Sequence, residues 1–291
     1  MFKGSIVALI TPFREGSFDE PAYRALIDWH LEEGTDGFVP CGTTGESPTL
    51  THDEHRLAVE TCVAAVAGRA PVIAGTGSNA TAEAIALTQH AEKAGADAAL
   101  IVTPYYNKPG QEGLYRHYKA IHDATALPII IYNIPGRCVI DMSVETMARL
   151  ADLPRIVGVK DATADLARPI RTRLAIGDDF CQLSGEDATA LPFLAAGGHG
   201  CISVSANVAP KACARMHKAW QDGDFATASQ ISDSLSPLHA ALFCESNPVP
   251  VKYAVSLLGK CHSEARMPLQ QIGRASMELV EQAMRSAGLL G

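Results

Sequence analysis

The sequence lacks any long uninterrupted hydrophobic run and is poor in charged and aromatic residues. No stretch approaches the ~20 apolar residues needed to span a bilayer, and residues 1–10 lack the long apolar region of a signal peptide. Basic residues are the scarcer charge, with 24 Lys and Arg against 32 Asp and Glu, for a net charge of -8. We therefore expect neither nucleic acid nor a membrane as partner.

Cysteine pairs with metal-binding or redox spacing are also missing. The chain has 8 cysteines, but none form a C-x-x-C motif. Scattered cysteines in a chain of 291 residues are typical of reduced thiols in a cytosolic protein and not of a disulfide framework. We therefore expect a cytoplasmic protein. Hydrophobic residues make up 47% of the chain, which is enough for a large core.

Short apolar runs alternate with longer segments of helical character along most of the chain. Nearly continuous apolar runs are typical of strands in a parallel sheet that is buried on both faces. The predicted strands span residues 5–10, 37–41, 71–75, 98–103, 128–132, 156–160, 180–184 and 200–205.

Helical segments separate these strands. Residues 51–54 (Thr-His-Asp-Glu) have the form of a capping box, and the alanine-rich segment 81–94 ends at Gly95, a plausible C-cap. Further barrel helices are predicted for residues 111–123, 144–151, 164–174, 187–195 and 210–221. Three more are predicted for residues 224–243, 248–258 and 270–287.

Eight strand–helix repeats predict an α/β fold, a closed (β/α)8 or TIM barrel. Residues 1–223 would form the catalytic barrel. Residues 224–291 would form a C-terminal three-helix extension, packed on the barrel or on another subunit. An open doubly wound sheet is the structural alternative.

Polar segments follow several of the predicted strands. In such a barrel, catalytic residues come from the carboxyl ends of the strands and the loops after them. The polar segments would therefore converge at one mouth; they are residues 42–46, 103–107, 132–137, 160–161 and 184–187.

Lys160 is the most informative residue of this set because it closes the apolar run 156–159. Desolvation there disfavours the ammonium and leaves more free amine, which can attack a ketone to form a Schiff base. The alternative is a lysine that extends to water or pairs with Asp161. Tyr132 ends the neighbouring strand, where its phenol could relay protons or merely pack at the mouth.

Other groups at the same mouth favour an anionic substrate. The hydroxyls of Thr43 and Thr44 could link phenols, and the glycines beside them let backbone N–H groups approach a carboxylate. Arg137 suits a second carboxylate as a bidentate partner. The simpler interpretations are a tight turn for residues 42–46 (the threonine loop), a surface ion pair for Arg137, and packing for Tyr105 and Tyr106.

Two further motifs resemble a dinucleotide site and a metal site, but each lacks a feature that such a site requires. Residues 75–80 match the dinucleotide fingerprint G-x-G-x-x-A, yet Asp97 precedes the next strand instead of ending it. His52 and His55 are spaced i, i+3 and not i, i+4, with no third ligand evident. We interpret both histidines as surface groups of a first helical turn. We expect no cofactor and no metal.

The motifs together resemble the dihydrodipicolinate synthase family of pyruvate-dependent Schiff-base aldolases, over essentially the whole chain. Each motif alone is weak, but the combination is specific. It comprises residues 42–46 (GTTGE), 102–107 (VTPYYN), 132–137 (YNIPGR), 158–162 (GVKDA) and 248–252 (PVPVK).

This resemblance implies a Schiff-base condensation of pyruvate with L-aspartate-4-semialdehyde, on the diaminopimelate route to lysine. Lys160 would be the nucleophile. Thr43, Tyr132 and Tyr106 would relay protons, with Tyr106 entering from a neighbouring subunit. The family is commonly a homotetramer, a dimer of dimers, which gives this crossover a purpose.

The resemblance also implies the binding residues. Thr44 would hold the pyruvate carboxylate, Arg137 would hold the semialdehyde carboxylate, and Gly185 and Ile202 would line the pyruvate pocket. Many members are inhibited by lysine. The residues at matching positions here are Ser47, His52, His55, Asn79, Glu83 and Tyr105.

Two positions depart from the family pattern. Cys138 and Val139 replace small polar or glycine residues after Arg137, which could alter acceptor preference, and Pro48 replaces alanine near the lysine positions. Another pyruvate-dependent barrel, such as N-acetylneuraminate lyase or a keto-deoxy-sugar-acid aldolase, is the alternative function. A non-catalytic barrel and an oxidoreductase are the more distant ones.

Overall fold

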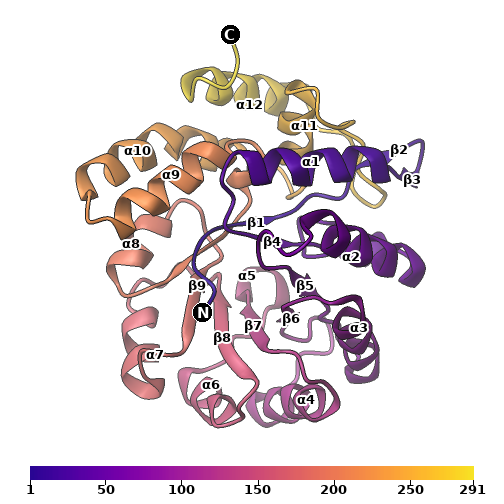
Figure 1. Ribbon diagram of the computed structural model, residues 1–291, viewed down its shortest axis with the longest axis vertical. Helices are drawn as coiled ribbons and strands as arrows, with labels where there is room; N and C mark the ends of the chain where they lie inside the picture. The colour runs from indigo at the N-terminus through magenta and orange to yellow at the C-terminus, as the bar shows by residue number, and fades with distance from the viewer.

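The computed structural model describes residues 1–291 and contains eight parallel strands with helices around them (Figure 1). The barrel strands are β1 (Gly4–Ala8), β4 (Gly37–Val39), β5 (Ile73–Gly75), β6 (Ala98–Val102), β7 (Ile129–Asn133), β8 (Ile156–Asp161), β9 (Cys181–Ser184) and β10 (Gly200–Ser203). They are hydrogen bonded in the order β4-β1-β10-β9-β8-β7-β6-β5.

The two ends of this row meet and close the barrel. Phe38 in β4 bridges to Val72, next to β5, and the Phe38 N–H donates to the Pro71 carbonyl at 2.9 Å. The predicted (β/α)8 barrel is therefore confirmed, and the open-sheet alternative is wrong. Because every barrel strand has two neighbours, the barrel sheet has no exposed edge.

A helix follows each barrel strand. These helices are α1 (Glu20–Glu32), α2 (His52–Val66), α3 (Thr81–Ala94), α4 (Gln111–Ala124), α6 (Val144–Ala151), α7 (Arg168–Ile176), α8 (Ala190–Ala195) and α9 (Pro210–Gln221). Shorter elements are the hairpin β2 (Phe13–Arg14) and β3 (Ser17–Phe18), the 3-10 turns η1 (Ser47–Thr49) and η2 (Ser205–Asn207), and α5 (Pro135–Cys138). The hairpin was not predicted.

Local sequence signals explain several helix ends. The capping box is confirmed, because the Thr51 side chain and the Glu54 side chain each bond the other's backbone N–H. Gly95 ends α3 with a φ of 88°. The predicted start at Ala164 is wrong, because Ala164 has a left-handed φ of 59° and the helix begins at Arg168. The predicted start at Asp187 is also too early.

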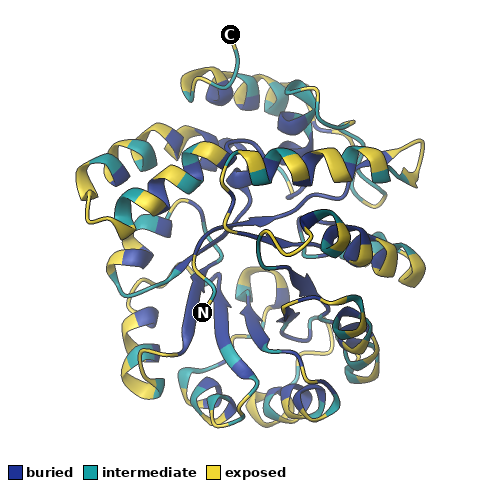
Figure 2. Cartoon of the chain, in the orientation of Figure 1, coloured by how far each residue is buried: buried dark blue, intermediate teal, exposed yellow.

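The barrel interior is filled by side chains from the strands themselves. Ile6, Val39, Ile130, Leu183 and Ile202 belong to one buried cluster that also contains Tyr132. A second buried cluster lies between the strands and helices α2, α3, α4 and α6. Figure 2 shows the strands as almost wholly buried, with the helices exposed on their outer faces. The packed interior leaves only the ends of the barrel for a site.

Three helices follow the barrel: α10 (Phe225–Ala241), α11 (Val249–Leu257) and α12 (Arg274–Ser286). Helix α12 packs against α10 and α11 and lies at the periphery of the molecule, beyond α1 (Figure 1). Residues of all three helices share one hydrophobic cluster with Leu26 and Ile27 of α1. The division at residues 223 and 224 stays a prediction. No helix combines the length and apolar character needed to cross a membrane.

Buried histidines make the fold sensitive to acid. Burial lowers the pKa of His217 and of His117 to about 4, and that of His30 to about 3. Between these values and the ordinary pKa of 6.5, the unfolded chain binds protons that the folded chain cannot, so stability falls as pH decreases through this window. At one pH unit below 6.5, each such histidine lowers the free energy of unfolding by roughly 1 kcal/mol.

We therefore expect His217→Gln to reduce the loss of melting temperature between pH 7.5 and pH 5.5. Differential scanning calorimetry of both proteins at the two pH values measures this loss. His262→Gln is the matched control, since His262 is exposed. An equal loss in the wild-type and His217→Gln proteins would contradict the assignment.

Candidate functional site

Lys160 and Tyr132 lie opposite each other near the carboxyl ends of the adjacent strands β8 and β7. Both are buried, each with 6% of its surface exposed. The Lys160 Nζ lies 4.3 Å from the centroid of the Tyr132 ring. The structure thus brings together a buried amine and a phenol at the end of the barrel where catalytic groups are found.

Asp161, the next residue, takes no part in this contact. Strand alternation directs it away from Lys160, and Arg168 Nε lies 2.8 Å from Asp161 Oδ2 in a buried ion pair. The interpretation of Lys160 as the partner of Asp161 is therefore wrong. Burial raises the pKa of Asp161, and hydrogen bonds from Thr163 and the charge of Arg168 oppose this shift.

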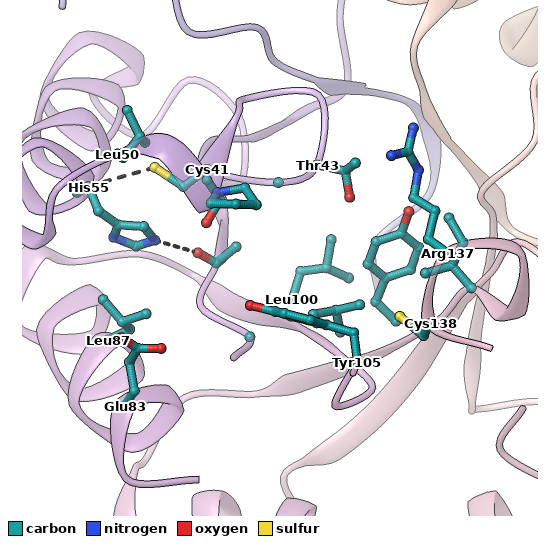
Figure 3. A pocket seen from close by; sticks show the side chains of 18 of the residues that line it. Cys41, Thr43, Leu50, His55, Glu83, Leu87, Leu100, Tyr105, Arg137 and Cys138 are labelled. Atoms are coloured by element: carbon teal, nitrogen blue, oxygen red, sulfur yellow. Dashed lines mark hydrogen bonds between the residues drawn. The ribbon is translucent and has the colours of Figure 1, made fainter. Parts of the chain in front are cut away.

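A cavity of about 480 Å³ opens beside Tyr132 (Figure 3). Thr43 and Arg137 lie at one end, and His55, Leu87 and Glu83 lie at the other. Its lining includes these predicted site residues: Thr43, Tyr132, Arg137, Ser47, His52, His55, Glu83 and Tyr105. Two of the predicted catalytic residues, Thr43 and Tyr132, therefore share one cavity with five of the six predicted effector residues. Lys160, Thr44, Gly185, Ile202, Asn79 and Tyr106 are not part of this lining.

Thr44, Gly185 and Ile202 belong to three different strands or the loops that follow them, β4, β9 and β10. Thr44 is buried, and Ile202 in β10 packs in the interior cluster that contains Tyr132. Gly185 directly follows β9, and a Cβ on it would lie 2.7 Å from the Cβ of Ala162. A side chain at Gly185 would thus collide with the chain just beyond Lys160.

Tyr105 and Tyr106 point in different directions. Tyr105 lines the cavity, and its pKa is raised by burial and by the nearby Glu83 carboxylate. Tyr106 is 90% exposed and has a left-handed φ of 67°, an uncommon conformation for a bulky residue. Its phenol is therefore directed outward from the chain.

The far end of the cavity holds an acidic group with several partners. Glu83 accepts hydrogen bonds from Ser78 and from His52 Nε2, the latter at 2.8 Å. These contacts, Ser78 first, lower the pKa of Glu83. Asn79 contributes a carbonyl that accepts from Asn107 Nδ2 at 2.8 Å.

The surface interpretation of the two histidines holds for only one of them. The His52 side chain is largely exposed, whereas His55 is 3% exposed and places Nε2 2.8 Å from the Gly75 carbonyl. Burial is the main cause that lowers the pKa of His55. The fourth position of α2 faces the barrel, which is why the prediction fails for His55.

The glycines of residues 75–80 serve backbone packing. A Cβ on Gly75 would lie 2.3 Å from the Cys41 carbonyl oxygen, and one on Gly77 would lie 2.4 Å from the Val102 nitrogen. Close approach of the backbone at Cys41 to Gly75, and of the backbone of β6 to Gly77, therefore requires glycine at both positions. No group of three or more His, Cys, Asp or Glu side chains is arranged to hold a metal.

The sequence reasoning assigned no role to two residues of the C-terminal extension that contact the site. Asn247 Nδ2 donates to Thr44 Oγ1 at 3.0 Å, and Lys252 Nζ donates to Glu46 Oε1 at 2.6 Å. Lys252 belongs to the PVPVK motif and Glu46 to the GTTGE motif, so each partner lies in a recognisable motif. More than 200 positions separate the partners, and no local pattern reveals such a contact.

The fold and the buried Lys160–Tyr132 pair define a (β/α)8-barrel enzyme with an amine at its catalytic face. The model of the "Dihydrodipicolinate synthetase family" matches residues 1–287, and the chain belongs to this family. Its activity is that of a 4-hydroxy-tetrahydrodipicolinate synthase, a lyase of lysine biosynthesis. This activity separates it from the sugar-acid aldolases considered above.

The similarity extends over whole chains. The 4-hydroxy-tetrahydrodipicolinate synthase of Rhodospirillum centenum is 65% identical to this chain, and the alignment covers 100% of both proteins. Dihydrodipicolinate synthase from Acinetobacter baumannii, solved in complex with pyruvate, is 44% identical with a TM-score of 0.97 and full coverage of both chains. The synthase from Cyanidioschyzon merolae, solved with lysine bound, is 41% identical with a TM-score of 0.96 and 99% coverage of each.

Proposed function

We propose that Lys160 attacks the ketone of pyruvate and forms a Schiff base, whose enamine then adds to the aldehyde of L-aspartate-4-semialdehyde. The observation that carries this proposal is the contact between the buried amine of Lys160 and the buried ring of Tyr132. An amine in this position is shielded from water and lies beside a group able to exchange protons. The pyruvate complex of the Acinetobacter baumannii relative supports the choice of substrate.

Proton transfer is assigned to Tyr132, Thr43 and Tyr106. Tyr132 and Thr43 line the same cavity, which supports a relay between their hydroxyls. Tyr106 points out of its own subunit, so it would act in the site of a second copy. The relay is therefore complete only in a dimer.

The binding roles follow from charge and position. Thr44 holds the pyruvate carboxylate, and Arg137, at the mouth of the cavity, holds the carboxylate of the semialdehyde. Gly185 and Ile202 line the pyruvate pocket. Glycine at position 185 lets the end of β9 pack closely against Ala162, just beyond Lys160, which supports this role.

Borohydride reduction tests the Schiff base directly. Incubation with pyruvate and sodium borohydride is expected to add the mass of one reduced pyruvate to the tryptic peptide that contains Lys160. Lys211 offers an internal control, because its side chain is 72% exposed and lies far along the sequence. Modification of Lys211 in place of Lys160, or no adduct at all, would contradict the proposal.

We further propose that the active form is a homotetramer, a dimer of dimers, located in the cytoplasm. The outward Tyr106 supports one interface. Exposed Ile170 and Leu174, four residues apart on α7, form an apolar patch together with exposed Leu166 in the turn before the helix, which supports a second interface. All 8 cysteines are free, as expected in a reducing compartment. Sedimentation velocity of the wild-type protein and of Leu174→Glu tests the second interface.

L-Lysine is the proposed feedback effector. The cavity end with Ser47, His52, His55, Glu83 and Tyr105 supports this site, since the Glu83 carboxylate can accept from the effector's ammonium. The lysine complex of the Cyanidioschyzon merolae relative adds support. Asn79 belongs to this predicted set, and its backbone carbonyl fixes the neighbouring Asn107.

Saturating lysine is expected to lower the condensation rate. Glu83→Gln is expected to raise the half-inhibitory lysine concentration at least about tenfold, because it removes one charge-assisted hydrogen bond to the effector. Rates are measured against each variant's own uninhibited rate. Glu60→Gln, which changes an exposed carboxylate on α2, is the matched control. A wild-type rate unaffected by lysine would contradict feedback, and Pro48 would then be the first position to restore to alanine.

A further inference from the structure

Asn247 lies where the C-terminal extension reaches the threonine loop of the site. It sits in the loop between α10 and α11 and is 6% exposed. Its side-chain Nδ2 donates to Thr44 Oγ1 at 3.0 Å, and its main-chain carbonyl accepts from Arg137 Nη2 at 3.3 Å. One residue therefore contacts both side chains that are assigned to carboxylate binding.

We propose that Asn247 is a positioning residue for the pyruvate carboxylate, acting through the hydroxyl of Thr44. This inference rests on the proposed role of Thr44. A hydroxyl has one donor and two acceptor positions. Because the Asn247 amide occupies an acceptor position of Thr44 Oγ1, the Thr44 proton remains available to donate to a carboxylate.

The extension holds the same loop at a second point, which keeps Asn247 in register with Thr44. Lys252, on α11, forms a fully buried ion pair with Glu46 at 2.6 Å and also donates to the Thr11 carbonyl at 2.9 Å. The backbone N–H of Arg266 donates to the other Glu46 oxygen at 2.9 Å. The extension thus contacts the loop at two positions, Thr44 and Glu46, which are two residues apart. Asn247 makes the contact with Thr44.

Two substitutions separate positioning from simple packing. Asn247→Asp keeps the shape of the side chain but replaces the amide donor with a carboxylate. The carboxylate accepts a hydrogen bond from the Thr44 hydroxyl, so that hydroxyl can no longer donate to the substrate, and its charge repels an anionic substrate. Asn247→Ala removes the contact without adding charge. Positioning predicts a larger rise in the pyruvate KM for Asn247→Asp than for Asn247→Ala, whereas a purely structural role predicts that the isosteric aspartate is tolerated better.

The experiment is steady-state kinetics of the full-length enzyme, with both substrates varied and the product reduced by a coupled reductase. We expect the pyruvate KM to rise about tenfold or more in Asn247→Asp, with kcat changed by less than about threefold, as for loss of a hydrogen bond to a charged group. In a Thr44→Val background, Asn247→Ala should change the KM by less than about twofold, because coupled residues are not additive.

Ser246→Ala is the matched control, since Ser246 is the exposed neighbour in the same loop. A pyruvate KM within twofold of wild type in both Asn247 variants would overturn the inference, and so would an Asn247→Ala effect that persists undiminished in Thr44→Val. A lower melting temperature with an unchanged KM would also overturn it. Failure of the wild-type protein to form a Schiff base with pyruvate would instead contradict the proposed function.

Discussion

Lys160→Ala is expected to lower kcat for the condensation by about 10⁴-fold or more, the scale seen when a covalent nucleophile is removed. The other buried lysine, Lys252, cannot replace it, because Lys252 is paired with Glu46. Without the imine, pyruvate cannot form the enamine that adds to the aldehyde. The loss should therefore appear at any pyruvate concentration.

The coupled assay with saturating pyruvate and semialdehyde measures this loss. Lys160→Arg retains a cation and much of the volume but supplies no nucleophilic amine, so it should be equally inactive. Lys211→Ala controls for the removal of a lysine from the surface. Melting temperatures establish that the variants remain folded. More than about one hundredth of wild-type activity in Lys160→Ala would refute the nucleophile assignment.

Lys252→Met is expected to give the largest loss of stability. It leaves the Glu46 carboxylate buried without its cation, and breaking a buried ion pair in this way costs about 3–5 kcal/mol. Each kcal/mol shifts the melting temperature of a chain somewhat smaller than this one by about 2–4 °C. We therefore expect the melting temperature to fall on the order of 10 °C.

The double substitution Lys252→Met with Glu46→Gln is the informative companion to this variant. Replacing both partners removes the unpaired charge, so much of the lost stability should return. Calorimetry of the wild-type, single and double variants at one pH measures the coupling. The Glu46 carboxylate also accepts a hydrogen bond from the Arg266 backbone N–H. Loss of these contacts should disorder the threonine loop, and activity should fall as a result. Equal melting temperatures for the single and double variants would contradict a coupled pair.

Much of the fold was predictable because its signals are local. The apolar runs located all eight barrel strands, and the helices α3, α6 and α9 have the bounds that were predicted. Errors arose where a side chain binds to another part of the fold. The Asp187 carboxylate accepts from the backbone of Val204 and Ser205 instead of beginning α8.

The sequence by itself determined the barrel, the family and the barrel end at which Lys160, Tyr132 and Arg137 lie. It could do so because strand periodicity and short motifs are encoded in neighbouring residues, and parallel strands bring their ends together. Only the tertiary structure decided that His55 is buried, that Asp161 pairs with Arg168, and that the C-terminal extension holds Thr44 and Glu46. Those facts depend on contacts between residues far apart in the chain, and side-chain direction and burial arise only when the elements pack.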